Sequence, residues 1–178
     1  MALPSQSKYA AYTKFKKDGQ YEADFEAGSN ATFKEGAVIK GACKAGVYSK
    51  VENNVIFESN AEFGNNVKIG DGVIIKGSSS MGVYSKVGKN CTFGGNVKFA
   101  NNNECGDGCI FNSGVKMGVY CKFGNECSFG PGLESGNNAK FGDNCTFADQ
   151  SVFGVYNKYG KGCKFGLNCK FGAGSKPK

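Results

Sequence analysis

Residues 63–73 read Phe-Gly-Asn-Asn-Val-Lys-Ile-Gly-Asp-Gly-Val, and this stretch decides the fold. Val67 and Ile69 are two residues apart, so their side chains point to one face of an extended strand, while Lys68 points to the other. The residue before each inward valine is Asn or Gly, the types that best tolerate positive φ. The stretch therefore predicts short strands that are separated by tight corners.

The same six-residue pattern continues along most of the chain. A small inward site recurs from Thr13 to Cys169, and a large inward site two residues later recurs from Phe15 to Phe171, which gives 27 hexads without an insertion. Phe occupies 14 of the 27 large sites, and only Ser135 is neither apolar nor aromatic. One hexad cannot bury its own inner face, so the hexads must coil and stack. An all-β parallel β-solenoid is predicted, because a helix would require a 3.6-residue period.

A longer period gives the length of one coil. The motif Gly-Val-Tyr-x-Lys occupies residues 46–50, 82–86, 118–122 and 154–158, with a degenerate copy at 10–14. Its 36-residue spacing fits coils of 12 or 18 residues, but only sorting by 18 separates the outward residues into chemically uniform columns. We therefore expect three strands per coil and about nine coils. The predicted boundaries are a lead-in at 1–9, the solenoid at 10–172 and a tail at 173–178.

Residues 63–73 resemble the hexapeptide-repeat family, whose members form triangular left-handed β-helices with 18-residue coils. The resemblance covers about nine-tenths of the chain, which differs from the family in using Phe where Leu, Ile or Val is usual. It implies that enzymatic members, acyltransferases and carbonic anhydrases, need histidines as base or zinc ligands. This chain has no histidine. We therefore expect no enzyme activity, no catalytic residue and no bound cofactor or metal, with acyltransferase activity as the less favoured alternative.

The nine cysteines all fall on inward sites. Cys105 takes a large site, and the others take small sites: Cys43, Cys91, Cys109, Cys121, Cys127, Cys145, Cys163 and Cys169. Five of them should form a buried ladder beside a matching phenylalanine stack. Metal binding or redox chemistry is the alternative to a packing role, but no C-x-x-C pair is present. Unpaired buried thiols and the lack of an apolar leader favour a cytoplasmic location, and no apolar run is long enough for a membrane span.

One outward column is basic and forms a candidate charged face, which consists of Lys50, Lys68, Lys86, Lys122, Lys140 and Lys158. Four tyrosines, Tyr48, Tyr84, Tyr120 and Tyr156, stand alongside it. The net charge of +7 permits binding of a polyanion. The favoured interpretation is that the charges discourage sticking between sheets.

A second outward column is apolar and β-branched and forms a candidate interface, which consists of Val38, Ile56, Ile74, Thr92 and Ile110. A flat apolar strip on a polar rod usually marks a contact surface, so side-by-side association is the first expectation. Ice binding is the competing hypothesis, although Thr92 and Thr146 stand alone rather than in regular ranks.

The solenoid ends suggest a further mode of association. The repeat persists to Phe171 with no helical cap visible in the sequence, so copies could stack head to tail into a filament. Pro4 and Pro177 are the alternative, as residues that blunt the ends. The sequence thus predicts a structural protein whose partner is itself, with ice binding as runner-up and polyanion binding third.

Overall fold

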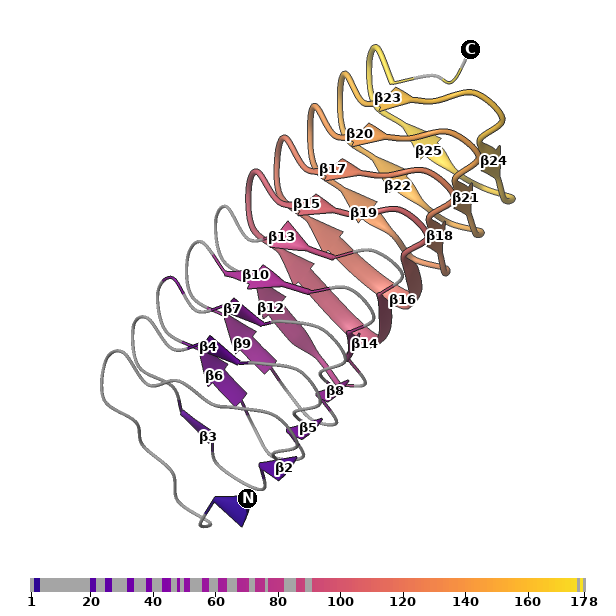
Figure 1. Ribbon diagram of the computed structural model, residues 1–178. Coiled ribbons are helices and arrows are strands. Elements are labelled where there is room, and N and C mark those ends of the chain that lie inside the picture. The colour runs from indigo at the N-terminus through magenta and orange to yellow at the C-terminus, as the bar shows by residue number, and fades with distance from the viewer. Residues whose placement is uncertain are drawn as a thin grey trace.

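The computed structural model describes residues 91–175 without a gap, residue 177, and short segments before residue 91. These segments are 2–3, 20–21, 25–26, 32–33, 38–39, 43–45, 48, 50–51, 56–57, 61–63, 67–70, 73–75, 77–81 and 86–88. The described residues form a parallel β-solenoid and contain no helix, which confirms the predicted fold class. Figure 1 shows the coils stacked along one axis, with the two chain ends at opposite ends of the rod.

Three columns of short strands make the three faces of the rod. The first face, here called the lysine face, consists of β4 (Thr32–Phe33), β7 (Lys50–Val51), β10 (Lys68–Ile69), β13 (Lys86–Val87), β15 (Glu104–Cys105), β17 (Lys122–Phe123), β20 (Lys140–Phe141) and β23 (Lys158–Tyr159).

The second face begins with β1 (Ala2–Leu3) and carries the predicted apolar strip. It continues with β2 (Gln20–Tyr21), β5 (Val38–Ile39), β8 (Ile56–Phe57), β11 (Ile74–Ile75), the first parts of β14 (Thr92–Phe99) and β16 (Ile110–Met117), β18 (Ser128–Phe129), β21 (Thr146–Phe147) and β24 (Lys164–Phe165). The third face consists of β3 (Phe25–Glu26), β6 (Cys43–Ala45), β9 (Ala61–Phe63), β12 (Ser79–Met81), the second parts of β14 and β16, β19 (Glu134–Ser135), β22 (Val152–Phe153) and β25 (Lys170–Phe171).

The strand register confirms the 18-residue coil. Lys122 pairs with Lys140, Ser128 with Thr146 and Glu134 with Val152, always in parallel and 18 residues apart. The stretch that is described without a gap, residues 91–175, covers about five turns. The total of about nine coils stays a prediction. Strand β1 also pairs with β2 at this spacing, so the pairing reaches into the segment that we predicted as a lead-in.

One corner departs from the regular pattern. Strands β14 and β16 each run eight residues through the corner between the second and third faces, and a bulge shifts the register so that Asn96 pairs with Ser113. Asn96, which we expected to favour positive φ, does not adopt it. Its side-chain oxygen lies 2.0 Å from where a Cβ on Gly114 would stand, and Gly114 has a φ of +60°, so glycine is favoured opposite it.

The other corners follow the predicted chemistry in part. From Asn102 to Gly174, every sixth residue has positive φ, between 56° and 75°. Gly108, Asn144 and Asn168 confirm the expectation that Gly or Asn stands before the small site. The same conformation at Tyr120 and Tyr156 was not expected, because bulky side chains rarely adopt it.

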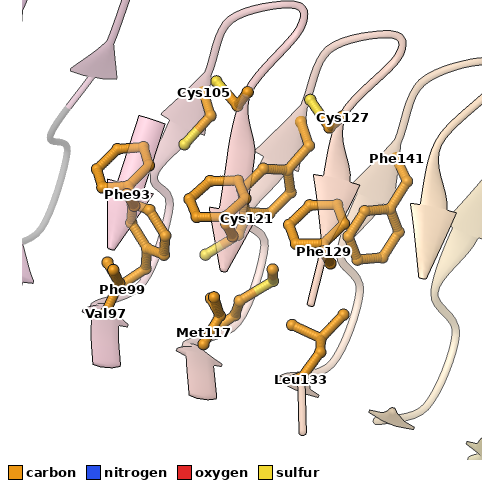
Figure 2. Close-up of a cluster of buried hydrophobic side chains, with 14 of the residues drawn as sticks. Phe93, Val97, Phe99, Cys105, Met117, Cys121, Cys127, Phe129, Leu133 and Phe141 are labelled. Carbon is orange, nitrogen blue, oxygen red and sulfur yellow. The ribbon is translucent and has the colours of Figure 1, made fainter. Parts of the chain in front are cut away.

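The interior is filled by stacked rings. Phe93, Phe111, Phe129, Phe147 and Phe165 form the predicted column, with centroids 4.7–5.1 Å apart and planes within 12°. Rings from the other two faces meet this column edge-on, as Phe123 does against Phe129 at 5.1 Å and 87°. Figure 2 shows Phe93, Phe99, Phe129 and Phe141 with Cys121 and Cys127 inside the coils. Stacked and edge-on contacts are the favoured geometries for aromatic pairs, so the rings of the three faces stabilise one another in the interior.

The last described residues continue the coil. Gly174 repeats the left-handed corner, and Ser175 is buried where the next small site is due. The Ser175 hydroxyl accepts a hydrogen bond from the Asn157 amide, 18 residues earlier, at 2.8 Å. Residues 173–175, which we assigned to the tail, therefore extend the strand-and-corner pattern.

Candidate functional surfaces

The lysine face is divided by one acidic residue. Lys50, Lys68, Lys86, Lys122, Lys140 and Lys158 are exposed neighbours in one register column, with Glu104 between Lys86 and Lys122. The Glu104 carboxylate binds Lys86 Nζ at 2.9 Å and Lys122 Nζ at 3.2 Å, and these hydrogen bonds lower its pKa. Lys140 and Lys158 form no ion pair with a described residue. Glu104 therefore offsets positive charge at the middle of the column, between Lys86 and Lys122.

A row of tyrosines and asparagines borders the lysine face at one corner. Tyr120 and Tyr156 alternate there with Asn102 and Asn138, and Tyr48 occupies the same place in the motif nearer the N-terminus. All five have positive φ, and the three tyrosine side chains are 55–62% exposed. Tyr84, the remaining copy, lies outside the described residues. The backbone is held by bonds between coils, such as that from Tyr120 N to Asn137 O at 3.0 Å.

The predicted apolar strip is one continuous column. Val38, Ile56, Ile74, Thr92 and Ile110 are consecutive register partners. Ile110 is 47% exposed, whereas the other four are half-buried. Beyond Ile110 the column becomes polar through Ser128, Thr146 and Lys164. The strip is therefore confined to the N-terminal two-thirds of its face.

A ladder of side-chain caps at a second corner was missed in our sequence analysis. Asp107 Oδ1 accepts a hydrogen bond from Asn125 N at 2.8 Å, Asn125 Oδ1 from Asp143 N at 2.7 Å, and Asp143 Oδ1 from Lys161 N at 2.7 Å. Sorting the residues of this corner by 18 as well would have aligned these Asx side chains. They satisfy amides that the strand ladder leaves free at the corner.

The cysteines form the predicted interior ladder. Cys91, Cys109, Cys127 and Cys145 are buried, and Cys163 is half-buried. Each donates to a backbone carbonyl, as Cys145 Sγ does to Gly124 O at 3.3 Å. Contact with Cys109 and burial raise the pKa of Cys127 to about 12. Among the described residues, no group of His, Cys, Asp or Glu is arranged to hold a metal ion.

Ser135, the single polar large site, has a partner that the sequence did not reveal. Its hydroxyl accepts a hydrogen bond from Asn157 Nδ2 at 3.0 Å and donates one to Gly136 O at 3.1 Å. Asn157 Oδ1 in turn accepts one from Ala139 N at 2.7 Å. A buried serine and a buried asparagine thus satisfy each other in adjacent coils.

The last described coil is more open than those before it. Strands β23, β24 and β25 each pair on one side only among the described strands. Their inward rings, Tyr159, Phe165 and Phe171, are half-buried. The equivalent rings one coil earlier, Phe141, Phe147 and Phe153, are at most 4% exposed. Within the described part of the chain, this coil therefore combines strands without a partner on one side with exposed aromatic area.

Comparisons of this chain with protein-family models, curated proteins and solved structures found no match in any of the three. The described residues include no helix long and apolar enough to cross a lipid bilayer.

Proposed function

We propose that this protein is a non-enzymatic structural β-solenoid that self-associates end to end into a filament. The observation that carries the proposal is the open face of the last described coil. There, three strands have no partner on their outer side among the described residues, and Tyr159, Phe165 and Phe171 are only half-buried. An edge of this kind is a template for further strand pairing.

A second copy can complete this coil because the repeat is regular. A coil added in the same parallel register would extend all three strand columns and cover the three rings. Contacts between different ends of identical molecules are heterologous, and a heterologous contact that does not close generates an open polymer. The proposed product is therefore a filament rather than a closed dimer.

The apolar strip offers a second contact between copies or filaments. Val38, Ile56, Ile74, Thr92 and Ile110 form an unbroken register column on one face, so a flat partner could contact them together. Substituting Ile74→Lys would place a charge at the centre of this strip. We expect it to reduce lateral association while leaving end-to-end assembly intact.

Ice binding is the second candidate function, and the flatness of the same column favours it. Parallel in-register strands hold the strip residues about 4.8 Å apart in a straight row. Measurable thermal hysteresis by the purified protein would support this alternative, and its loss in Ile74→Lys would assign the activity to the strip.

We also infer left-handed coiling and kinship with hexapeptide-repeat proteins. Support comes from the 18-residue turn with three strands and a left-handed backbone residue at each corner from Asn102 to Gly174.

Negative-stain electron microscopy across a concentration series tests the proposed assembly. We expect thin fibres whose axial repeat equals one subunit length. Phe171→Lys should shorten or abolish them, because it places a charge in the proposed junction. Val152→Lys is the matched control, since Val152 faces solvent in the preceding coil of the same face. Discrete rods at all concentrations, or equal fibres from both variants, would overturn the proposal.

A further inference from the structure

The tyrosine corner has an unusual backbone conformation. Tyr48, Tyr120 and Tyr156 hold φ of 57–64°, a conformation that disfavours bulky side chains. The equivalent corner positions on the other two edges, from Gly108 to Asn168, carry only Gly, Asn, Glu or Gln. Backbone strain of this kind gathers at sites of recognition. Exposed aromatic rings are thus retained at a costly position on one edge alone.

The rings are also regularly spaced along the rod. Tyr120 and Tyr156 occupy alternate coils, so their backbone positions lie about 9.6 Å apart, twice the distance between paired strands. Asn138 stands between them and offers an amide at the same corner. This distance is close to the length of one disaccharide in an extended β-linked polysaccharide, whose sugar faces stack on aromatic rings.

Positive charge runs parallel to these rings. Lys122, Lys140 and Lys158 are consecutive and exposed in the adjacent column, about 4.8 Å apart. That distance is close to the rise of one sugar in such a polymer. At the N-terminal end of this stretch, Tyr120 and Lys122 line an open depression of about 340 Å³ with Lys86, Asn102 and Glu104. An acidic chain could therefore meet one lysine per sugar and one tyrosine per disaccharide.

From this juxtaposition we propose that the edge formed by Tyr120, Tyr156 and the column Lys122, Lys140, Lys158 binds an extended anionic polysaccharide along the rod axis. The tyrosines provide the sugar platforms, and Asn138 is placed to hydrogen-bond hydroxyl groups between them. The lysines provide charge complementarity. The inference does not depend on end-to-end assembly, because this edge runs along the side of the rod.

Binding of fluorescein-labelled hyaluronan oligosaccharides, which carry one carboxylate per disaccharide, tests the proposal by fluorescence anisotropy. Tyr120→Asn with Tyr156→Asn gives the informative double variant, because Asn already occupies this corner in alternate coils. We expect at least about tenfold weaker binding, as for the loss of aromatic anchors at an interface. Gln150→Asn is the matched control at a left-handed position on another edge, and its affinity should not change.

Two double lysine variants distinguish binding at this edge from general attraction between opposite charges. The double variant Lys140→Gln with Lys158→Gln should weaken binding and reduce its dependence on salt. The control is Lys164→Gln with Lys170→Gln, which changes the net charge by the same amount on the other faces and should have little effect. Thermal melts of all variants report whether the fold is intact.

Three results would overturn the proposal: no binding by the wild-type protein, equal losses from both lysine pairs, or no loss from the tyrosine variant. Tighter, tyrosine-dependent binding of oligo-dT would assign the edge to single-stranded nucleic acid instead. Cello-oligosaccharides, which are neutral, should bind more weakly than hyaluronan, and equal binding would remove the lysines from the site.

Discussion

Coils with a neighbour on both sides, here called closed, differ from the last described coil, here called open. The two kinds share one sequence pattern, but their inward rings have different surroundings. Phe129 lies between two stacked rings, Phe111 and Phe147, and is almost fully buried. Phe165 stacks on Phe147 alone and is half-buried. A repeat protein is stabilised mainly by contacts between neighbouring units, so position along the rod decides what each ring contributes.

The largest expected effect on the free energy of unfolding comes from removing one ring in a closed coil and one in the open coil. Phe129→Ala should lower the free energy of unfolding by about 4 kcal/mol, because it leaves a cavity between two rings. Phe165→Ala should cost roughly half as much, because less apolar area is lost. Urea unfolding at low protein concentration measures both. Equal losses for the two variants would mean that the last described coil is already covered at low protein concentration. In the proposed filament a second copy covers this coil, so the loss for Phe165→Ala should rise toward that for Phe129→Ala at concentrations that allow assembly.

Alkaline pH should destabilise the closed coils through their thiols. The pKa of Cys127 is raised to about 12 in the folded chain, whereas the pKa of a cysteine thiol in an unfolded chain is about 8.5. The unfolded state therefore loses its proton first, and stability is fully present below about pH 8.5. It falls by up to about 1.4 kcal/mol per pH unit for such a thiol as pH rises toward the folded value. Urea unfolding between these pH values should show a smaller slope in Cys127→Ala than in the wild-type protein, and an unchanged slope would contradict the assignment.

The capped corner offers a smaller and more local test. Asp143→Ala removes the acceptor of the Lys161 amide and should cost about 1 kcal/mol. Asp143→Asn keeps an oxygen in that place, as Asn125 does naturally one coil earlier. Thermal melting should therefore distinguish the alanine variant from both the wild-type protein and the asparagine variant. Equal melting temperatures for the two variants would indicate that charge, rather than the hydrogen bond, matters at this corner.

The smallest effect should appear at the tyrosine corner and have the opposite sign. Tyr120→Asn should raise the free energy of unfolding by up to about 1 kcal/mol, because Asn accepts positive φ more readily. The converse change, Asn138→Tyr, should lower it. Differential scanning calorimetry of the pair checks the strain directly, and a destabilised Tyr120→Asn variant would show that the ring packs favourably instead.

Periodicity made the solenoid and its columns predictable. A residue at Cys127 or Phe129 has the same neighbours 18 positions away on either side, so the phenylalanine stack and the thiol ladder followed from spacing alone. The same reasoning placed the lysine column and the apolar strip in register. The spacing did not predict what these surfaces bind, because binding depends also on the chemistry of the partner.

Departures from the repeat could not be predicted, because each depends on an individual contact. The bulge at Asn96 arises where its side chain occupies space beside Gly114. Glu104 stands within the lysine column and bridges both of its neighbours. Ser135, the polar residue among the large sites, is hydrogen-bonded by Asn157. Such pairs join different coils, and no local pattern marks them.

The uninterrupted register also bears on how a rod of this kind can change length during evolution. Duplicating or deleting one 36-residue unit preserves every column, including the alternation of Tyr and Asn at one edge. A single 18-residue coil would keep the strand columns in register but break this alternation, whereas a length that is not a multiple of 18 would bring unlike residues side by side, such as lysines beside isoleucines. Unequal recombination between the near-identical Gly-Val-Tyr-x-Lys segments would supply such whole units. The chain can thus be lengthened or shortened in fixed units, each of which adds or removes two coils and one corner tyrosine.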